Sequence, residues 1–143
     1  MKRTISTIIL IATLTIALSA CGMGKVKIED YEWKMRTIMH GEDNQVVVDA
    51  VGEDDPAHPE AKIIDMTLTV KDGKITIPDH TNIKTYEGTY KVAQKTPAGT
   101  EYKITIDGKE GYATVAMTTY ADGTEEPTLP INLGTHSIYF YAE

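Results

Sequence analysis

The chain has 143 residues, one cysteine and a formal net charge of −7 at neutral pH. This length favours a single domain, and an acidic chain is a poor match for nucleic acid, whose phosphates require clustered Lys and Arg. A lone cysteine excludes an intramolecular disulfide framework.

The first 20 residues have the features of a bacterial export signal. Lys2 and Arg3 provide a positive start, and residues 8–17 form an apolar run that is shorter than the roughly 20 residues of a membrane span. The following Leu18-Ser19-Ala20-Cys21 resembles the lipobox of bacterial lipoproteins. The resemblance implies that residues 1–20 are removed and that Cys21 carries a thioether-linked diacylglycerol, usually with an N-acyl chain such as palmitate. The alternative is an ordinary secretory signal with an incidental cysteine.

The lipobox also implies a location. Cys21 would anchor the protein to the extracytoplasmic face of the cell membrane or the outer membrane, and residues 21–29 would form a short tether made flexible by Gly22 and Gly24. Without Lys2 and Arg3 the mature chain has 12 basic and 21 acidic side chains, a net charge of −9. We therefore do not expect it to lie flat on anionic lipid.

Residues 30–143 predict one all-β domain. Leu is scarce there, Thr, Val, Ile and Tyr are frequent, and apolar residues recur with period two instead of the helical period. In the first segment the alternation places Trp33, Met35 and Met39 on an inner face. Farther on, Asp72-Gly73 predicts a type I′ hairpin turn with Val70 opposite Ile75.

The remaining segments follow the same pattern. Residues 85–92, 101–106, 111–120 and 137–142 predict further strands, separated by Gly- and Pro-containing turns. About eight short strands at regular spacing favour an antiparallel barrel or sandwich, and the hairpin-sized links favour an up-and-down barrel.

A second resemblance supports this fold. Trp33, the segment 68–77 and Gly88-Thr89-Tyr90 look like the corresponding parts of small lipocalin-like β-barrel domains of bacterial lipoproteins, many of which have no assigned activity. The resemblance implies a barrel whose interior binds a small apolar or amphipathic ligand. The residues expected to line that interior are Trp33, Met35, Met66, Tyr90 and Tyr102.

Few residues predict chemistry. Ser137 is the single serine after the leader, and no nucleophile elbow surrounds it. The loop 52–60 contains Asp54, Asp55, His58 and Glu60, which match no metal-binding pattern; a solvated acidic loop is favoured over a weak Ca²⁺ site. Glu125-Glu126 before Pro127 predicts a solvated turn. We expect no catalytic residue, metal or cofactor.

The sequence thus predicts a membrane-anchored, non-enzymatic lipoprotein with a lipocalin-like barrel. Its expected partners are the membrane, through Cys21, and a small apolar ligand or an envelope protein. Two alternatives remain open. The first is a module for protein–protein contacts in the cell envelope, suggested by eight Tyr against one Phe. The second, less favoured, is an acid–base hydrolase.

Overall fold

The computed structural model of the chain describes residues 26–43 and 45–143, so the predicted leader and Cys21 lie outside the described residues. The described part contains a short 3-10 helix and ten strands: η1 (Ile28–Asp30), β1 (Trp33–Glu42), β2 (Gln45–Val51), β3 (Lys62–Ile63), β4 (Thr67–Lys71), β5 (Lys74–Asp79), β6 (Lys84–Thr96), β7 (Gly99–Ile106), β8 (Lys109–Thr119), β9 (Glu125–Leu133) and β10 (His136–Ala142).

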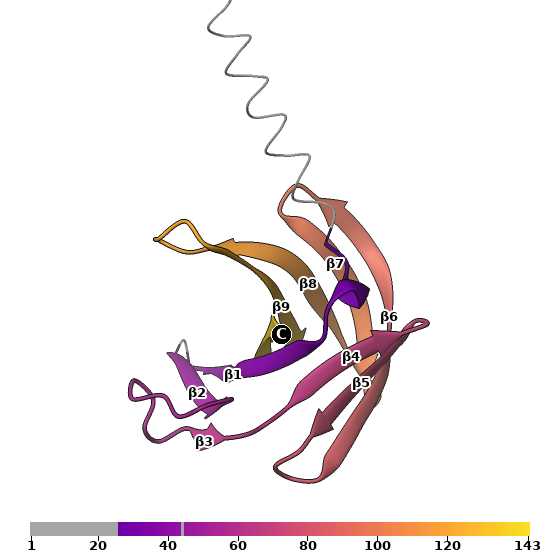
Figure 1. Ribbon diagram of the computed structural model, residues 1–143. Helices are drawn as coiled ribbons and strands as arrows, with labels where there is room; N and C mark the ends of the chain where they lie inside the picture. The colour runs from indigo at the N-terminus through magenta and orange to yellow at the C-terminus, as the bar shows by residue number, and fades with distance from the viewer. Residues whose placement is uncertain (1–25, 44) are drawn as a thin grey trace, which may run out of the picture.

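Eight of the strands close into an antiparallel barrel, which confirms the predicted fold (Figure 1). From β4 to β10 each strand pairs with the next one along the chain, as an up-and-down order requires. β1 closes the barrel because it pairs with β10 from Trp33 to His40 and with β4 through Trp33 and Lys34.

The two additional strands make the barrel asymmetric. One edge of β1 pairs with β4 at Trp33 and Lys34. Over Thr37–Glu42 the same edge pairs with β2 instead, and β3 pairs with β2 in parallel. Figure 1 shows β2 and β3 extending away from the barrel wall. The contact between β1 and β4 is therefore limited to the end of the barrel that contains Trp33.

The core follows from the period-two alternation along the strands. The predicted hairpin is confirmed: Asp72 and Gly73 both have positive φ, and Val70 pairs with Ile75. Apolar residues from the barrel strands other than β6, or directly beside them, are buried inside: Trp33, Met35, Met66, Leu68, Ile75, Ile77, Tyr102, Ile104, Ile106, Ala113, Val115, Leu129, Ile131 and Phe140, with Ile28 of η1.

The alternation predicted for the first strand is wrong beyond Met35. Met35 pairs with Phe140 and Thr37 with Tyr139, so Arg36 is an extra residue, a β-bulge that reverses the two faces of β1. Ile38 therefore packs against the core where the sequence placed Met39.

The solvated turn predicted at Glu125-Glu126 is also wrong. Both residues begin β9, where Glu125 pairs with Thr119 and Glu126 with Thr118 on β8. The Arg36 guanidinium forms two hydrogen bonds to the Glu126 carboxylate, at 2.6 and 3.2 Å. The prolines of this segment, which favoured a turn, are accommodated inside a barrel strand.

Within residues 26–43 and 45–143, no helix has the length and hydrophobicity needed to cross a membrane. The described strands close the barrel, and the cluster of buried core residues in the described part of the chain extends from Ile28 to Phe140. We therefore expect the chain from residue 22 onward to fold on its own.

Candidate functional site

One end of the barrel is plugged by η1. Ile28 is fully buried there, and its backbone is held from two sides. The Trp33 indole N–H donates a hydrogen bond to the Ile28 carbonyl oxygen at 2.9 Å, and the Ile28 N–H donates to the Tyr102 hydroxyl at 3.2 Å. The Tyr90 hydroxyl donates to the Glu29 carboxylate at 2.7 Å. The last residues of the predicted tether are thus part of the barrel.

Three of the five residues expected to bind a ligand form hydrogen bonds to the η1 plug instead. Trp33 and Tyr102 are buried, and Tyr90 packs edge-to-face on Tyr102 with ring centroids 5.8 Å apart. Burial, followed by the hydrogen bond to Glu29 and its negative charge, raises the pKa of Tyr90 to about 12. These three side chains close the barrel at this end.

The other two predicted residues lie on β1 and in the segment just before β4. Met35 is buried, and its N–H donates to the Met66 carbonyl oxygen at 2.9 Å, which joins β1 to the segment before β4. Met66 is buried as well, and it lines a cavity at the opposite end of the barrel. Of the five residues, Met66 alone contributes to that cavity.

This cavity, here called the barrel pocket, has a volume of about 430 Å³. It opens at the end of the barrel where β5, β7 and β9 finish and β6, β8 and β10 begin. Its wall is mainly apolar and consists of Ile38, Met66, Ile77, Tyr86, Ile106, Leu133 and Ile138.

Three charged side chains and a histidine surround the mouth of the barrel pocket. Lys84, Asp107, Lys109 and His136 line it together with the apolar wall. The Lys84 ammonium lies 3.9 Å from an Asp107 oxygen and 4.2 Å from the centre of the Tyr86 ring. Lys109 forms no ion pair with any residue in the described part of the chain. The mouth therefore offers positive charge beside an apolar interior.

The loop between β5 and β6 forms one side of this mouth and is tightly ordered by Asp79. This buried carboxylate accepts hydrogen bonds from the Thr81 and Asn82 N–H groups at 3.0 and 2.9 Å and from the Asn82 side-chain amide at 2.7 Å. At the loop's end, Ile83 has φ +53° and is 93% exposed, a strained and solvated position for a β-branched residue.

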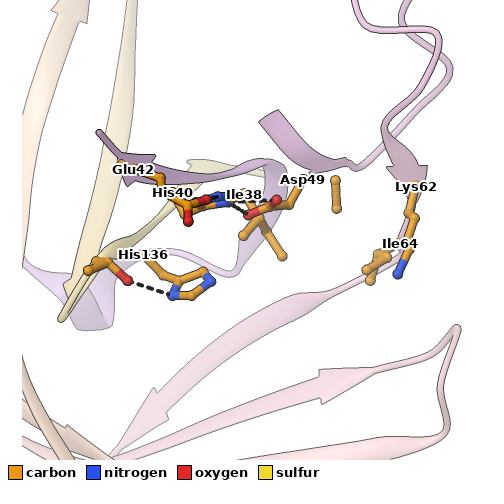
Figure 2. Close-up of a pocket in the computed structure, with 10 residues that line it drawn as sticks. Ile38, His40, Glu42, Asp49, Lys62, Ile64 and His136 are labelled. Atoms are coloured by element: carbon orange, nitrogen blue, oxygen red, sulfur yellow. Dashed lines mark hydrogen bonds and ion pairs between the residues drawn. The ribbon is translucent and has the colours of Figure 1, made fainter. Parts of the chain in front are cut away.

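A second hollow adjoins the barrel pocket and contains two histidines and a carboxylate. It is about 600 Å³ in volume, and it shares Ile38 and His136 with the barrel pocket. His40 on β1 and His136 on β10 are direct partners in the sheet, and their ring centroids lie 5.7 Å apart. The His40 Nδ1 atom lies 2.7 Å from both carboxylate oxygens of Asp49 on β2 (Figure 2).

The hydrogen bond to Asp49 has an electrostatic consequence for His40. It stabilises the imidazolium and outweighs partial desolvation, so the pKa of His40 is raised above its ordinary value, with a further contribution from Glu42. The Glu42 carboxylate lies 3.4 Å from His40 Nε2. Sequence analysis did not identify this cluster, because its members come from three strands and none belongs to a local motif.

The other residues considered for chemistry have structural roles. The Ser137 hydroxyl donates to the Asn132 side-chain oxygen at 2.7 Å. In the loop 52–60 the Asp55 carboxylate contacts His58 Nδ1 at 2.8 Å and accepts a hydrogen bond from the Ala57 N–H. The hydrogen bonds from His58 and Ala57 lower the pKa of Asp55. Within the described ranges, this loop does not contribute to any cluster of three potential metal ligands.

Comparisons with models of protein families, with curated proteins and with solved structures find no match to this chain.

Proposed function

We propose that the protein is a lipid-anchored, extracytoplasmic binding protein without enzymatic activity, which holds a small apolar or amphipathic ligand in its barrel pocket. The observation that carries this proposal is the cavity of about 430 Å³ with its largely apolar wall. Ligand pockets in proteins are typically about 300–1,000 Å³, and they combine an apolar lining with a few polar groups.

The side chains at the mouth indicate the kind of amphipathic ligand. Lys84 and Lys109 lie where a polar head group would emerge from the apolar interior, while Asp107 compensates one of the two charges. An apolar chain or ring with an acidic head, such as a fatty acid, would place its carboxylate among these ammonium groups. The apolar part would contact Ile106 and Ile138.

The ligand proposal is tested by native mass spectrometry of the chain from residue 22 onward, beside a denatured control. Additional mass that is lost on denaturation would identify a captured ligand. In parallel, a fluorescent fatty acid is titrated into the protein. We expect saturable uptake; a clean apo mass together with no uptake would contradict the proposal.

A matched pair of variants locates the binding. Ile138→Trp places an indole inside the barrel pocket, whereas Tyr112→Trp places the same indole at an exposed position on β8. We expect Ile138→Trp to weaken fatty-acid uptake at least tenfold and Tyr112→Trp to leave it unchanged. Equal effects of the two variants would place binding outside the pocket.

The alternative, a surface for contacts with an envelope protein, is favoured by a different observation. Ile83, Val46, Ile63 and Val47 are exposed apolar residues, with exposed fractions from 43 to 93%. Val46 and Val47 on β2 and Ile63 on the adjacent β3 lie on neighbouring strands, and contiguous exposed apolar surface often marks an interaction site. Cross-linking in the native envelope with wild-type protein and with Val46→Asp separates the two functions, because a loss of a cross-linked partner without a loss of fatty-acid uptake supports the alternative.

A further inference from the structure

We infer that His40, Asp49 and His136 form a binding site for a divalent transition-metal ion, with Zn²⁺ as the expected occupant. One potential ligand atom from each residue lies within 4.8 Å of the others. Within the described part of the chain, no other group of three His, Cys, Asp or Glu side chains has this spacing. The inference is independent of the proposed ligand in the barrel pocket.

The donor set selects the class of metal. Two imidazole nitrogens and a carboxylate oxygen suit Zn²⁺ and its neighbours Co²⁺, Ni²⁺ and Cu²⁺, whereas Ca²⁺ and Mg²⁺ prefer oxygen ligands alone. Three protein ligands leave a fourth tetrahedral position open. All three residues line the hollow of about 600 Å³, which leaves space for a further ligand such as water.

Two departures from regular strand pairing bring the residues together. The extra residue Arg36 turns His40 toward the inner side of β1. On β2, Ala50 pairs with Ile38 and Val48 with Met39, so Asp49 is a second bulge residue, and its carboxylate reaches His40. Bulges commonly re-aim a side chain at a functional site.

The arrangement is partly prepared for a metal ion. The His40 side chain is only 24% exposed, and Asp49 fixes its orientation. Two ligand atoms on one Zn²⁺ ion are about 3.3 Å apart for bonds of about 2.0–2.1 Å. The 2.7 Å contact between His40 and Asp49 must therefore lengthen by about half an ångström, with the ion replacing the shared proton.

Nearby charged side chains include one that attracts a bound cation and one that repels it. Glu42, whose carboxylate lies 3.4 Å from His40 Nε2, adds a negative charge beside the site. Lys62 on β3 lines the same hollow and opposes a cation, but Figure 2 shows its side chain on the far side from the His40–His136 pair. The local balance thus favours a cation.

The test uses the chain from residue 22 onward, without a polyhistidine tag and stripped with a chelator. Zn²⁺ is titrated calorimetrically, and Co²⁺ is titrated by visible absorption. We expect one ion per chain, d–d bands of a four- or five-coordinate Co²⁺ site, and no displacement by excess Ca²⁺. Histidine nitrogen NMR signals of His40 and His136 should shift with Zn²⁺.

Variants identify the ligands. His136→Gln and Asp49→Asn should each weaken Zn²⁺ binding at least roughly tenfold. His58→Gln is the matched control, because His58 also contacts an aspartate at 2.8 Å but has no third ligand; its binding should equal that of the wild type. His136 is exposed, so its variant remains informative even if Asp49→Asn destabilises the barrel. Absence of stoichiometric binding, or equal losses with His136→Gln and His58→Gln, would overturn the inference.

Discussion

At the scale of single residues, Asp79 shows how one buried carboxylate organises the mouth of the barrel. Desolvation opposes its ionisation, but hydrogen bonds from the Asn82 side chain and from the Asn82 and Thr81 N–H groups prevail, and the pKa of Asp79 is lowered. A carboxyl group whose pKa is lowered by folding contributes stability above its unfolded pKa of about 3.9, and this contribution is lost as the pH falls through the folded value.

We therefore predict that Asp79→Asn lowers the free energy of unfolding by about 1–3 kcal/mol at pH 7, since the new amide N–H group would face the Asn82 amide donor. The difference from the wild type should begin to shrink below about pH 4, where the Asp79 carboxyl of the unfolded chain becomes protonated, and should shrink further as the pH falls through the lowered folded value. Urea unfolding at pH 7 and pH 3 measures both values, with the exposed Asp54→Asn as control. An equal loss at both pH values would exclude the carboxylate charge as the cause.

The residues of the candidate site were only partly predictable from the sequence. Tyr90 and Tyr102 were expected to line an open interior, but their hydroxyl groups find partners on η1, which no alternation pattern in the sequence indicates. Met66 lines the barrel pocket. His40 and Asp49 are neighbours because two strands each carry one extra residue, and a bulge leaves no local signature in the sequence.

At the scale of elements, η1 acts as a plug that the barrel holds through polar groups. Tyr90 donates to Glu29, and its burial and that negative charge raise the pKa of Tyr90 to about 12. An acid whose pKa is raised by folding contributes stability that is fully present below its unfolded pKa of about 10. This stability is lost as the pH rises toward the folded value.

We predict that Tyr90→Phe lowers the free energy of unfolding by about 1–2 kcal/mol at pH 8, because the hydrogen bond to a charged partner is lost. The difference from the wild type should diminish between pH 10 and pH 12, when Tyr90 of the wild type ionises beside Glu29. Chemical unfolding across this range measures it. Tyr112→Phe, at an exposed position, is the control and should show no such pH dependence; a similar decline in both variants would contradict a role for the plug.

The elements themselves were largely predictable. Hairpins with Asp-Gly turns and period-two strands such as β7 specify their own register, and the structure agrees with both. β9 was not predicted, because Glu125, Glu126 and two prolines favour a turn when read locally. Its place in the sheet depends on pairing with β8 and β10 and on the ion pair between Arg36 and Glu126, all of which are long-range contacts.

At the scale of the whole molecule, the two ends of the barrel differ in what they face. The described chain begins at Val26, next to the plugged end, and the barrel pocket opens at the opposite end. If Cys21 carries lipid, the five residue-to-residue steps from Cys21 to Val26 span at most about 18 Å. The plug would then lie near the membrane, and the pocket mouth would face away from it.

We predict that fluorophores at the two ends of the barrel report this orientation. Once Cys21 is acylated it has no free thiol, so a second cysteine provides a unique label. A fluorophore at Ala98→Cys, in the turn between β6 and β7 at the plugged end, should be quenched by lipids with nitroxide head groups in vesicles carrying the lipidated protein. A fluorophore at Ile83→Cys, in the loop before β6 at the mouth, should be quenched much less, because collisional quenching by lipid requires contact with the bilayer surface. Equal quenching at the two positions would mean that the barrel lies on its side, and stronger quenching at residue 83 would mean that the mouth faces the membrane.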